Sequence, residues 1–263
     1  MARLYPLFSG SRGNSYFFGS KNAGVLIDAG KNCKQILIRL QQCEIDPSAI
    51  KGILVSHEHT DHVSALRVLA SKYKIPCFCS KGTGRQLIIN QVANGTFPMH
   101  ILEQNLQIAD LDIEHFHTSH DSEESIGFRI KTADDKVLSF VTDFGKVTDT
   151  VMEYTQNSDF CVVESNHDIS MLQAGPYPYS LKRRILADTG HLSNVACADF
   201  LIKLHKTGVK KFMLAHLSSD NNNPDLAYQT SNCALSMQGL TENVDYNISV
   251  APKENNDAKV VIF

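Results

Sequence analysis

Ile53-Leu-Val-Ser-His57-Glu-His59-Thr-Asp61-His62 is the stretch around which the chain is organised. A short apolar run leads directly into four side chains of metal-ligand type, three imidazoles and one carboxylate. Imidazole nitrogens and carboxylate oxygens bind zinc-like divalent ions at roughly 2.0–2.2 Å, so a close cluster of them can surround an ion. We therefore interpret residues 57–62 as a candidate metal site.

The spacing of these residues excludes one common zinc motif. The helical His-Glu-x-x-His pattern needs a histidine four positions after His57, where this chain has Asp61. The four side chains cannot all share one face of a helix or of a strand, so we predict a tight loop at the end of a strand. Such a loop can direct His57 and His59 to one ion, and Asp61 and His62 to a second ion. The alternative is a solvated His-rich loop or a single structural zinc site.

Size and composition indicate one large domain, which we place at residues 1–263. With 43% hydrophobic residues, a chain of 263 residues can bury a substantial core. The sequence contains neither a run of eighteen apolar residues nor a signal-peptide pattern at its start, so we expect a cytoplasmic protein without a membrane segment. Its oligomeric state stays open.

Cysteine usage and charge narrow the class further. The seven cysteines are an odd number without any Cys-x-x-Cys pair, which favours reduced thiols over a disulfide framework or a cysteine zinc site. The net charge of −3 gives no overall attraction to nucleic acid, although bound divalent cations would add local positive charge. The charge balance therefore neither supports nor excludes a polyanionic substrate.

Buried strands that end in a ligand-type residue recur along the chain. We predict such endings at Asp28, His57, Asp143, Glu164 and His216. Helices are predicted between and after these strand ends, at residues 33–43, 63–73, 83–92, 194–205 and 224–237, and the first two carry apolar residues at helical spacing. In α/β architectures the strand ends converge on one cleft, and a buried carboxylate or imidazole needs a partner there. We therefore expect these side chains to meet at a single site.

These motifs, in this order, resemble the metallo-β-lactamase superfamily over nearly the whole chain. The resemblance rests on residues 57–62 followed by His120, Asp143 and His216. It implies an α/β fold, classed as α+β in some schemes, built as a four-layer αβ/βα sandwich of two mixed sheets flanked by helices. It also implies two divalent metal ions: His57, His59 and His120 hold one, Asp61, His62 and His216 hold the other, and Asp143 bridges them.

Several further segments are similar to the YycJ/WalJ-type branch of that superfamily. They are residues 9–15, 119–121, 164–168, 190–194 and 215–221. The resemblance implies a nucleic-acid phosphodiesterase, with DNA as the favoured substrate and 5′-to-3′ exonuclease action. Histidine and aspartate ligands accept zinc, manganese or iron alike. The alternatives are a tRNase Z-like ribonuclease and a hydrolase of thioesters or lactones.

The expected mechanism assigns three catalytic residues. Two metal ions supply an activated water and neutralise the phosphoryl oxygens, and Asp61 is expected to orient that water. Glu164 and His191 are similar in placement to the carboxylate and histidine that assist the leaving group in the tRNase Z branch. We predict that His191 protonates the departing sugar oxygen while Glu164 fixes its tautomer. The alternative is that His191 caps the helix that follows it.

Other polar residues have weaker assignments. We expect Asp28 to orient a ligand by a hydrogen bond rather than to bind metal. For His167 and Asp168, supporting the ligands and forming a hydrogen-bonded loop are both open. Residues 9–15 read as a hairpin turn or an anion cradle, and the turn is favoured. Residues 182–184, with Tyr177 and Tyr179, form either a solvated basic turn, which is favoured, or a contact for phosphates and a terminal base.

Overall fold

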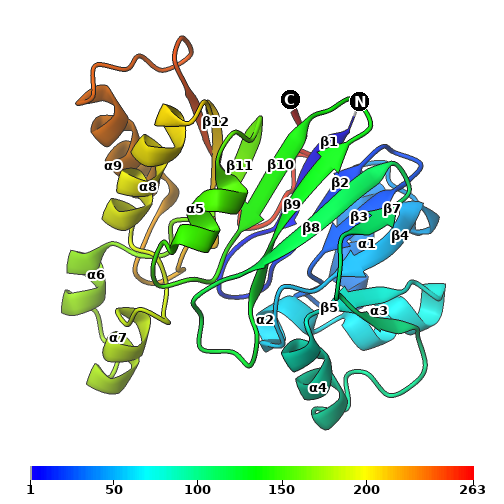
Figure 1. The fold of residues 1–263 in the computed structure, drawn as a ribbon. Helices are drawn as coiled ribbons and strands as arrows, with labels where there is room; N and C mark the ends of the chain where they lie inside the picture. The colour runs from blue at the N-terminus through cyan, green and yellow to red at the C-terminus, as the bar shows by residue number, and fades with distance from the viewer. Residues whose placement is uncertain (1) are drawn as a thin grey trace.

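Two mixed seven-stranded sheets form the centre of the computed structural model, which describes residues 2–263 (Figure 1). In the first sheet the strand order is β14-β1-β2-β3-β4-β5-β6. Its strands are β1 Arg3–Phe8, β2 Ser15–Gly19, β3 Gly24–Ile27, β4 Ile50–Leu54, β5 Cys77–Cys79, β6 Met99–Ile101 and β14 Val261–Ile262. Strands β3 to β6 run parallel, and the remaining pairs are antiparallel.

The second sheet repeats this pattern in the other half of the chain, with the order β13-β12-β11-β10-β9-β8-β7. Its strands are β7 Leu106–Ile108, β8 Leu111–His117, β9 Ile126–Thr132, β10 Val137–Val141, β11 Phe160–Glu164, β12 Lys211–Ala215 and β13 Asn247–Val250. Strands β10 to β13 run parallel, and β7 to β10 run antiparallel. Both sheets are therefore mixed, as predicted.

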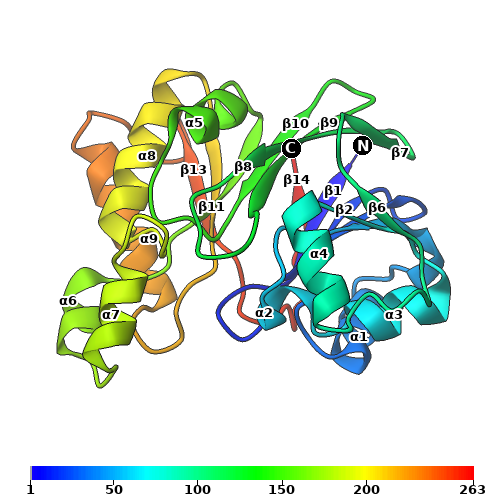
Figure 2. The ribbon, with the colours of Figure 1, turned by 60° about the horizontal axis from the view of Figure 1, so that its bottom comes forward.

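Helices cover the outer face of each sheet (Figures 1 and 2). Those of the first half are α1 Cys33–Gln42, the short 3₁₀ helix η1 Pro47–Ala49, α2 Thr60–Val63, α3 Leu66–Tyr73 and α4 Lys81–Ile89. Those of the second half are α5 Asp149–Thr155, α6 Ile169–Ala174, α7 Tyr179–Ile185, α8 Asn194–Lys206 and α9 Pro224–Ser236. Within residues 2–263, no helix is long and apolar enough to span a bilayer.

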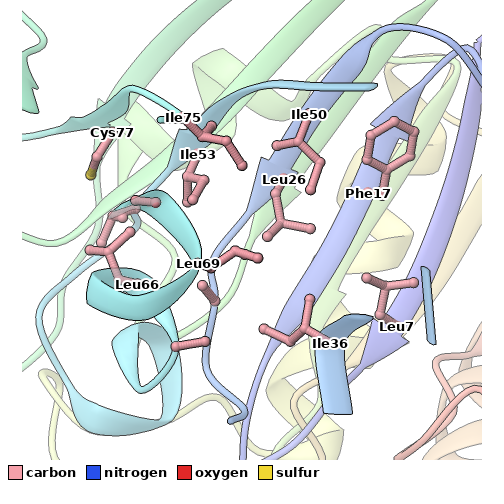
Figure 3. Close-up of a cluster of buried hydrophobic side chains, with 14 of the residues drawn as sticks. Leu7, Phe17, Leu26, Ile36, Ile50, Ile53, Leu66, Leu69, Ile75 and Cys77 are labelled. Atoms are coloured by element: carbon pink, nitrogen blue, oxygen red, sulfur yellow. The ribbon is translucent and has the colours of Figure 1, made fainter. Parts of the chain in front are cut away.

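Successive side chains of a strand point to opposite faces of the sheet, and this alternation gives each sheet an apolar surface toward the other sheet and another toward its helices. In β2, Tyr16 and Phe18 point into the core between the two sheets, whereas Phe17 packs in the layer beneath α1 and α3. Figure 3 shows that layer, where Leu26 and Ile53 of the sheet face Ile36 and neighbouring helical residues. Strands with apolar residues on both faces are the expected pattern for a sheet covered on both sides. The predicted αβ/βα sandwich is confirmed.

Two local predictions were wrong. The helix predicted at residues 83–92 begins at Lys81 and ends at Ile89, and the side chain of its N-cap Ser80 accepts a hydrogen bond from the backbone N–H of Thr83. Residues 57–62 are not wholly a loop, because α2 starts at Thr60. A single helical turn places Asp61 and His62 side by side, while His57 and His59 lie in the extended segment before it.

Candidate metal centre

Three of the expected site residues share an unusual backbone conformation at the end of a buried strand. Asp28, Asp143 and His216 have φ angles of 59°, 59° and 54°. The left-handed region costs an ordinary residue roughly 1–2 kcal/mol, so it persists only where the surroundings impose it. Each of these turns follows its strand directly or within two residues. The three side chains are thereby brought to one cleft between the sheets.

Three imidazoles form the first group of candidate ligands. Nδ1 of His59 lies 3.0 Å from Nε2 of His57 and 3.3 Å from Nε2 of His120. The three ring nitrogens thus converge on one point; His57 and His59 come from the segment between β4 and α2, and His120 comes from the loop after β8. Convergent lone pairs of this kind fit a cation that accepts nitrogen ligands.

The second group is Asp61, His62 and His216. Oδ2 of Asp61 lies 3.5 Å from Nε2 of both histidines. The Nδ1 atom of His62 is occupied by Asp28, whose Oδ2 lies 2.8 Å away. This contact fixes the ring and leaves Nε2 for the cluster, which is the orienting role expected of Asp28.

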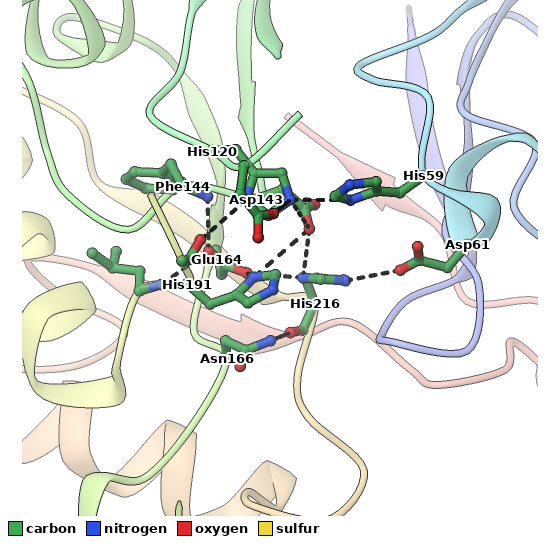
Figure 4. Close-up of polar contacts among 12 residues, drawn as sticks. His59, Asp61, His120, Asp143, Phe144, Glu164, Asn166, His191 and His216 are labelled. Atoms are coloured by element: carbon green, nitrogen blue, oxygen red, sulfur yellow. Dashed lines mark hydrogen bonds and ion pairs between the residues drawn. The ribbon is translucent and has the colours of Figure 1, made fainter. Parts of the chain in front are cut away.

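Asp143 lies between the two groups (Figure 4). Its Oδ2 is 3.4 Å from Nε2 of His62, and its Oδ1 is 4.0 Å from Nε2 of His120. Among residues 2–263, Oδ2 of Asp143 and Nε2 of His216 are buried without a hydrogen-bond partner. A buried polar atom without a partner is costly, and a cation would satisfy both atoms. The donor set therefore fits divalent metal, and all seven predicted ligands are brought together; their binding of metal stays a prediction.

Glu164 is fully buried at the end of β11 and accepts hydrogen bonds on both oxygens. Its Oε1 lies 2.8 Å from Nδ1 of His191 and 2.8 Å from Nδ1 of His216. Its Oε2 accepts the backbone N–H groups of Phe144 and Leu192. The helix after His191 is capped by Ser193, so the capping alternative for His191 is wrong.

The electrostatics distinguish the two groups. Burial, followed by the neighbouring His62, His120 and His59, holds the pKa of His57 well below its usual value. Burial also acts to lower the pKa of His216, but Asp143 and the contacts to Asp61 and Glu164 outweigh it and raise that pKa to about 10. The pKa of His62 is likewise raised against burial by Asp143, Asp28 and Asp61.

Two supporting residues were not found from the sequence. The Ser56 hydroxyl lies within hydrogen-bond distance of Asp28 and of Nδ1 of both His57 and His62. Asn14 binds the carbonyl of Asp61 through its backbone N–H and places Nδ2 3.1 Å from Nε2 of His62. The loop of residues 9–15 connects β1 to β2 and so forms the favoured hairpin turn. Serine and asparagine in a turn give no sequence signal of such contacts.

The structure also places His167, Asp168 and the basic residues 182–184. Asp168 caps α6 through its side chain, and the buried His167 ring makes no hydrogen bond within the described chain. The basic segment 182–184 is helical rather than a turn, because it belongs to α7. Lys182 binds the carbonyls of Gln173 and Gly175, whereas Arg184 pairs with Asp121.

The sequence of this chain is similar to a known protein family and to two named relatives. The family pattern described as "Beta-lactamase superfamily domain" matches residues 24–217. The chain is 35% identical over 246 residues to "Exodeoxyribonuclease WalJ" of Streptococcus pneumoniae serotype 2 (strain D39 / NCTC 7466), covering 92% of this chain and 91% of that protein. It is 34% identical over 236 residues to "Exodeoxyribonuclease YycJ" of Bacillus anthracis, covering 89% of each.

A solved structure supports the fold. The metallo-β-lactamase fold protein YhfI from Bacillus subtilis superposes with a TM-score of 0.74 over the full length of both chains. At 16% sequence identity, this similarity concerns the fold alone.

Proposed function

This chain belongs to the metallo-β-lactamase superfamily, within the branch of the WalJ and YycJ exodeoxyribonucleases, and we propose that it is a metal-dependent exonuclease that hydrolyses DNA. One observation carries the proposal: Asp143 lies between a three-histidine group and the Asp61–His62–His216 group. That arrangement suits a two-metal phosphodiesterase. We treat residues 1–263 as one hydrolase domain, because each half of the fold supplies part of the ligand set.

We propose that His57, His59 and His120 hold one divalent ion, that Asp61, His62 and His216 hold the other, and that Asp143 contacts both. Zinc or manganese suits these ligands, and iron is also compatible. Bound together, two such ions activate a water molecule and neutralise phosphate charge. The buried unpartnered atoms of Asp143 and His216 support this assignment.

Two residues of the protein would position the attacking water and the proton for the leaving group. Asp61 is the ligand with an accessible carboxylate, its side chain being 25% exposed, and it would orient the attacking water. His191 would donate a proton from Nε2 to the departing sugar oxygen, since its Nδ1 is held by Glu164. That contact to Glu164 also raises the pKa of His191 against the effect of burial, which favours the protonated form that an acid needs.

Two features favour nucleic acid over a thioester or lactone. The cavity beside His191 places Asp121, Asn166 and Ser218 next to the apolar Leu181 and Ile185, and so is not the wholly apolar tunnel that an acyl chain needs. A second, small cleft is lined by Arg12, Lys31 and Lys253, which can contact backbone phosphates.

The seven free cysteines fit a reducing, cytoplasmic location.

The direct test is an assay on end-labelled substrates. The metal-loaded protein is incubated with single- and double-stranded DNA and RNA, and Asp61→Ala is the control. We expect stepwise shortening of DNA from the 5′ end, lost in the variant. Preferential cleavage of RNA would indicate the ribonuclease alternative, and no cleavage of any substrate would refute the proposal.

A further inference from the structure

A cavity of about 170 Å³ adjoins His191 on the side of α7. Tyr177, Leu181, Arg184 and Ile185 line it together with His191 and its neighbour Gly190. Four other loops near the metal centre add one residue each: Ser11, Asp121, Asn166 and Ser218. Pockets for drug-sized ligands typically occupy roughly 300–1,000 Å³, so this smaller cavity has room for about one nucleobase and its sugar. Its size alone would restrict what can enter.

Two polar contacts connect α7 and the segment before it to the loops that carry predicted ligands. Arg184 of α7 pairs with Asp121, which follows His120; the bond from Nη2 to Oδ1 is 3.1 Å. The Tyr177 hydroxyl donates to Oδ2 of Asp220 at 2.7 Å, which ties the segment before α7 to the loop after His216. The wall of the cavity is therefore held to the loops that carry His120 and His216.

The charge of the cavity favours the uncharged part of a nucleotide. The Arg184 guanidinium is paired with Asp121, which offsets its positive charge in the cavity. The Tyr177 ring provides an aromatic surface, and aromatic stacking is tolerant of base identity. A base with its sugar suits this lining better than a backbone phosphate does.

We propose that this cavity receives the terminal nucleotide that is released, with its base against Tyr177, and that it thereby confines cleavage to chain ends. This inference rests on the proposed function. His191 lines the cavity, and its Nε2 makes no hydrogen bond within residues 2–263, so its proton is available to an oxygen of the occupant.

The position of the acid sets the polarity. The water oxygen bonds to phosphorus, the bond from phosphorus to the 3′ oxygen breaks, and the His191 proton goes to that oxygen. The water's surplus proton is lost to solvent. The departing group then ends in a 3′-hydroxyl and the shortened strand keeps a 5′-phosphate. A cavity with room for one nucleoside on this side therefore suits a 5′-terminal nucleotide, whereas removal from the 3′ end would place the long strand there.

The test uses single-stranded DNA with an abasic nucleotide at either the 5′ or the 3′ terminus, under single-turnover conditions. We expect the wild type to remove an abasic 5′ nucleotide about 10-fold more slowly than a normal one, as loss of one stacking contact predicts. The 3′ lesion should have no effect. Tyr177→Ala should abolish the discrimination, and Tyr177→Phe should retain it because the ring remains.

The control variant is Tyr179→Ala, which alters an exposed tyrosine on α7 outside the cavity lining and should behave as wild type. Leu181→Trp fills the cavity and should also abolish the discrimination. Hydrolysis of bis(p-nitrophenyl) phosphate reports an intact metal centre in every variant. An active enzyme whose Tyr177→Ala and Leu181→Trp variants discriminate as the wild type does, or that responds to the 3′ lesion, would overturn this inference. A wild type without exonuclease activity would refute the proposed function itself.

Discussion

Oε1 of Glu164 lies 2.8 Å from Nδ1 of His216, and the same oxygen lies 2.8 Å from Nδ1 of His191. One buried carboxylate oxygen therefore fixes the orientation of a predicted metal ligand and of the predicted acid. Both rings consequently present Nε2 to the cleft, where metal and substrate would bind.

Glu164→Gln should be strongly disruptive despite its similar shape. Both carboxylate oxygens accept two hydrogen bonds each, so an amide NH₂ group would face donors in either orientation. Leaving buried donors unsatisfied costs about 1–3 kcal/mol. We expect urea unfolding to show a loss of this size, with weakened activity. Glu153→Gln, an exposed control, should change stability by less than about 0.5 kcal/mol; equal effects of the two variants would contradict the assignment.

His191→Ala should impair substrates according to their leaving group. General acid catalysis contributes about 10²–10⁴-fold where the departing oxygen is basic, as in DNA. A nitrophenolate leaves without that help, so activity on nitrophenyl phosphodiesters should fall far less. His100→Ala, a histidine outside the ligand clusters, provides the control. Equal losses on both substrates would argue against an acid role.

Metal binding should release protons at one group and not at the other. In the metal-free protein, the pKa of His216 is raised to about 10 against burial, mainly by Asp143, whereas burial holds the pKa of His57 well below its usual value. His57 is therefore neutral at pH 7 and ready to bind, but His216 must first lose a proton. Titration calorimetry in buffers of different ionisation enthalpy should resolve a first ion with little proton release. The second ion should release protons and bind more tightly as the pH rises toward 10. Identical proton release for both ions would contradict this expectation.

Asp28→Asn should weaken one ion selectively. Asp28 accepts hydrogen bonds from Nδ1 of His62 and from the backbone N–H of Ser56, and it does not belong to either ligand group. Loss of such a supporting carboxylate typically lowers metal affinity about 10–100-fold. Competition with a chelator should detect this loss for the ion at His62, and the three-histidine group should keep its affinity. An unchanged second affinity would remove Asp28 from the account.

Much of the site could be predicted because its chemistry is carried by residue types that stand out at strand ends. Asp143 and His216 follow apolar runs, and the sequence places them where parallel strands converge. The contacts of Asn14 and Ser56 could not be predicted, since they depend on the left-handed turn at Asp28 and on the packing of two loops. The helical turn at Thr60 was missed because four residues are too few to show a periodicity.

We propose that seven side chains hold two divalent ions. Anomalous diffraction from crystals of the metal-loaded protein, recorded at the absorption edge of the metal, would locate these ions. We predict two peaks about 3.5–4 Å apart, one among His57, His59 and His120 and one among Asp61, His62 and His216, with Asp143 touching both. A single peak, or peaks away from these residues, would contradict the account.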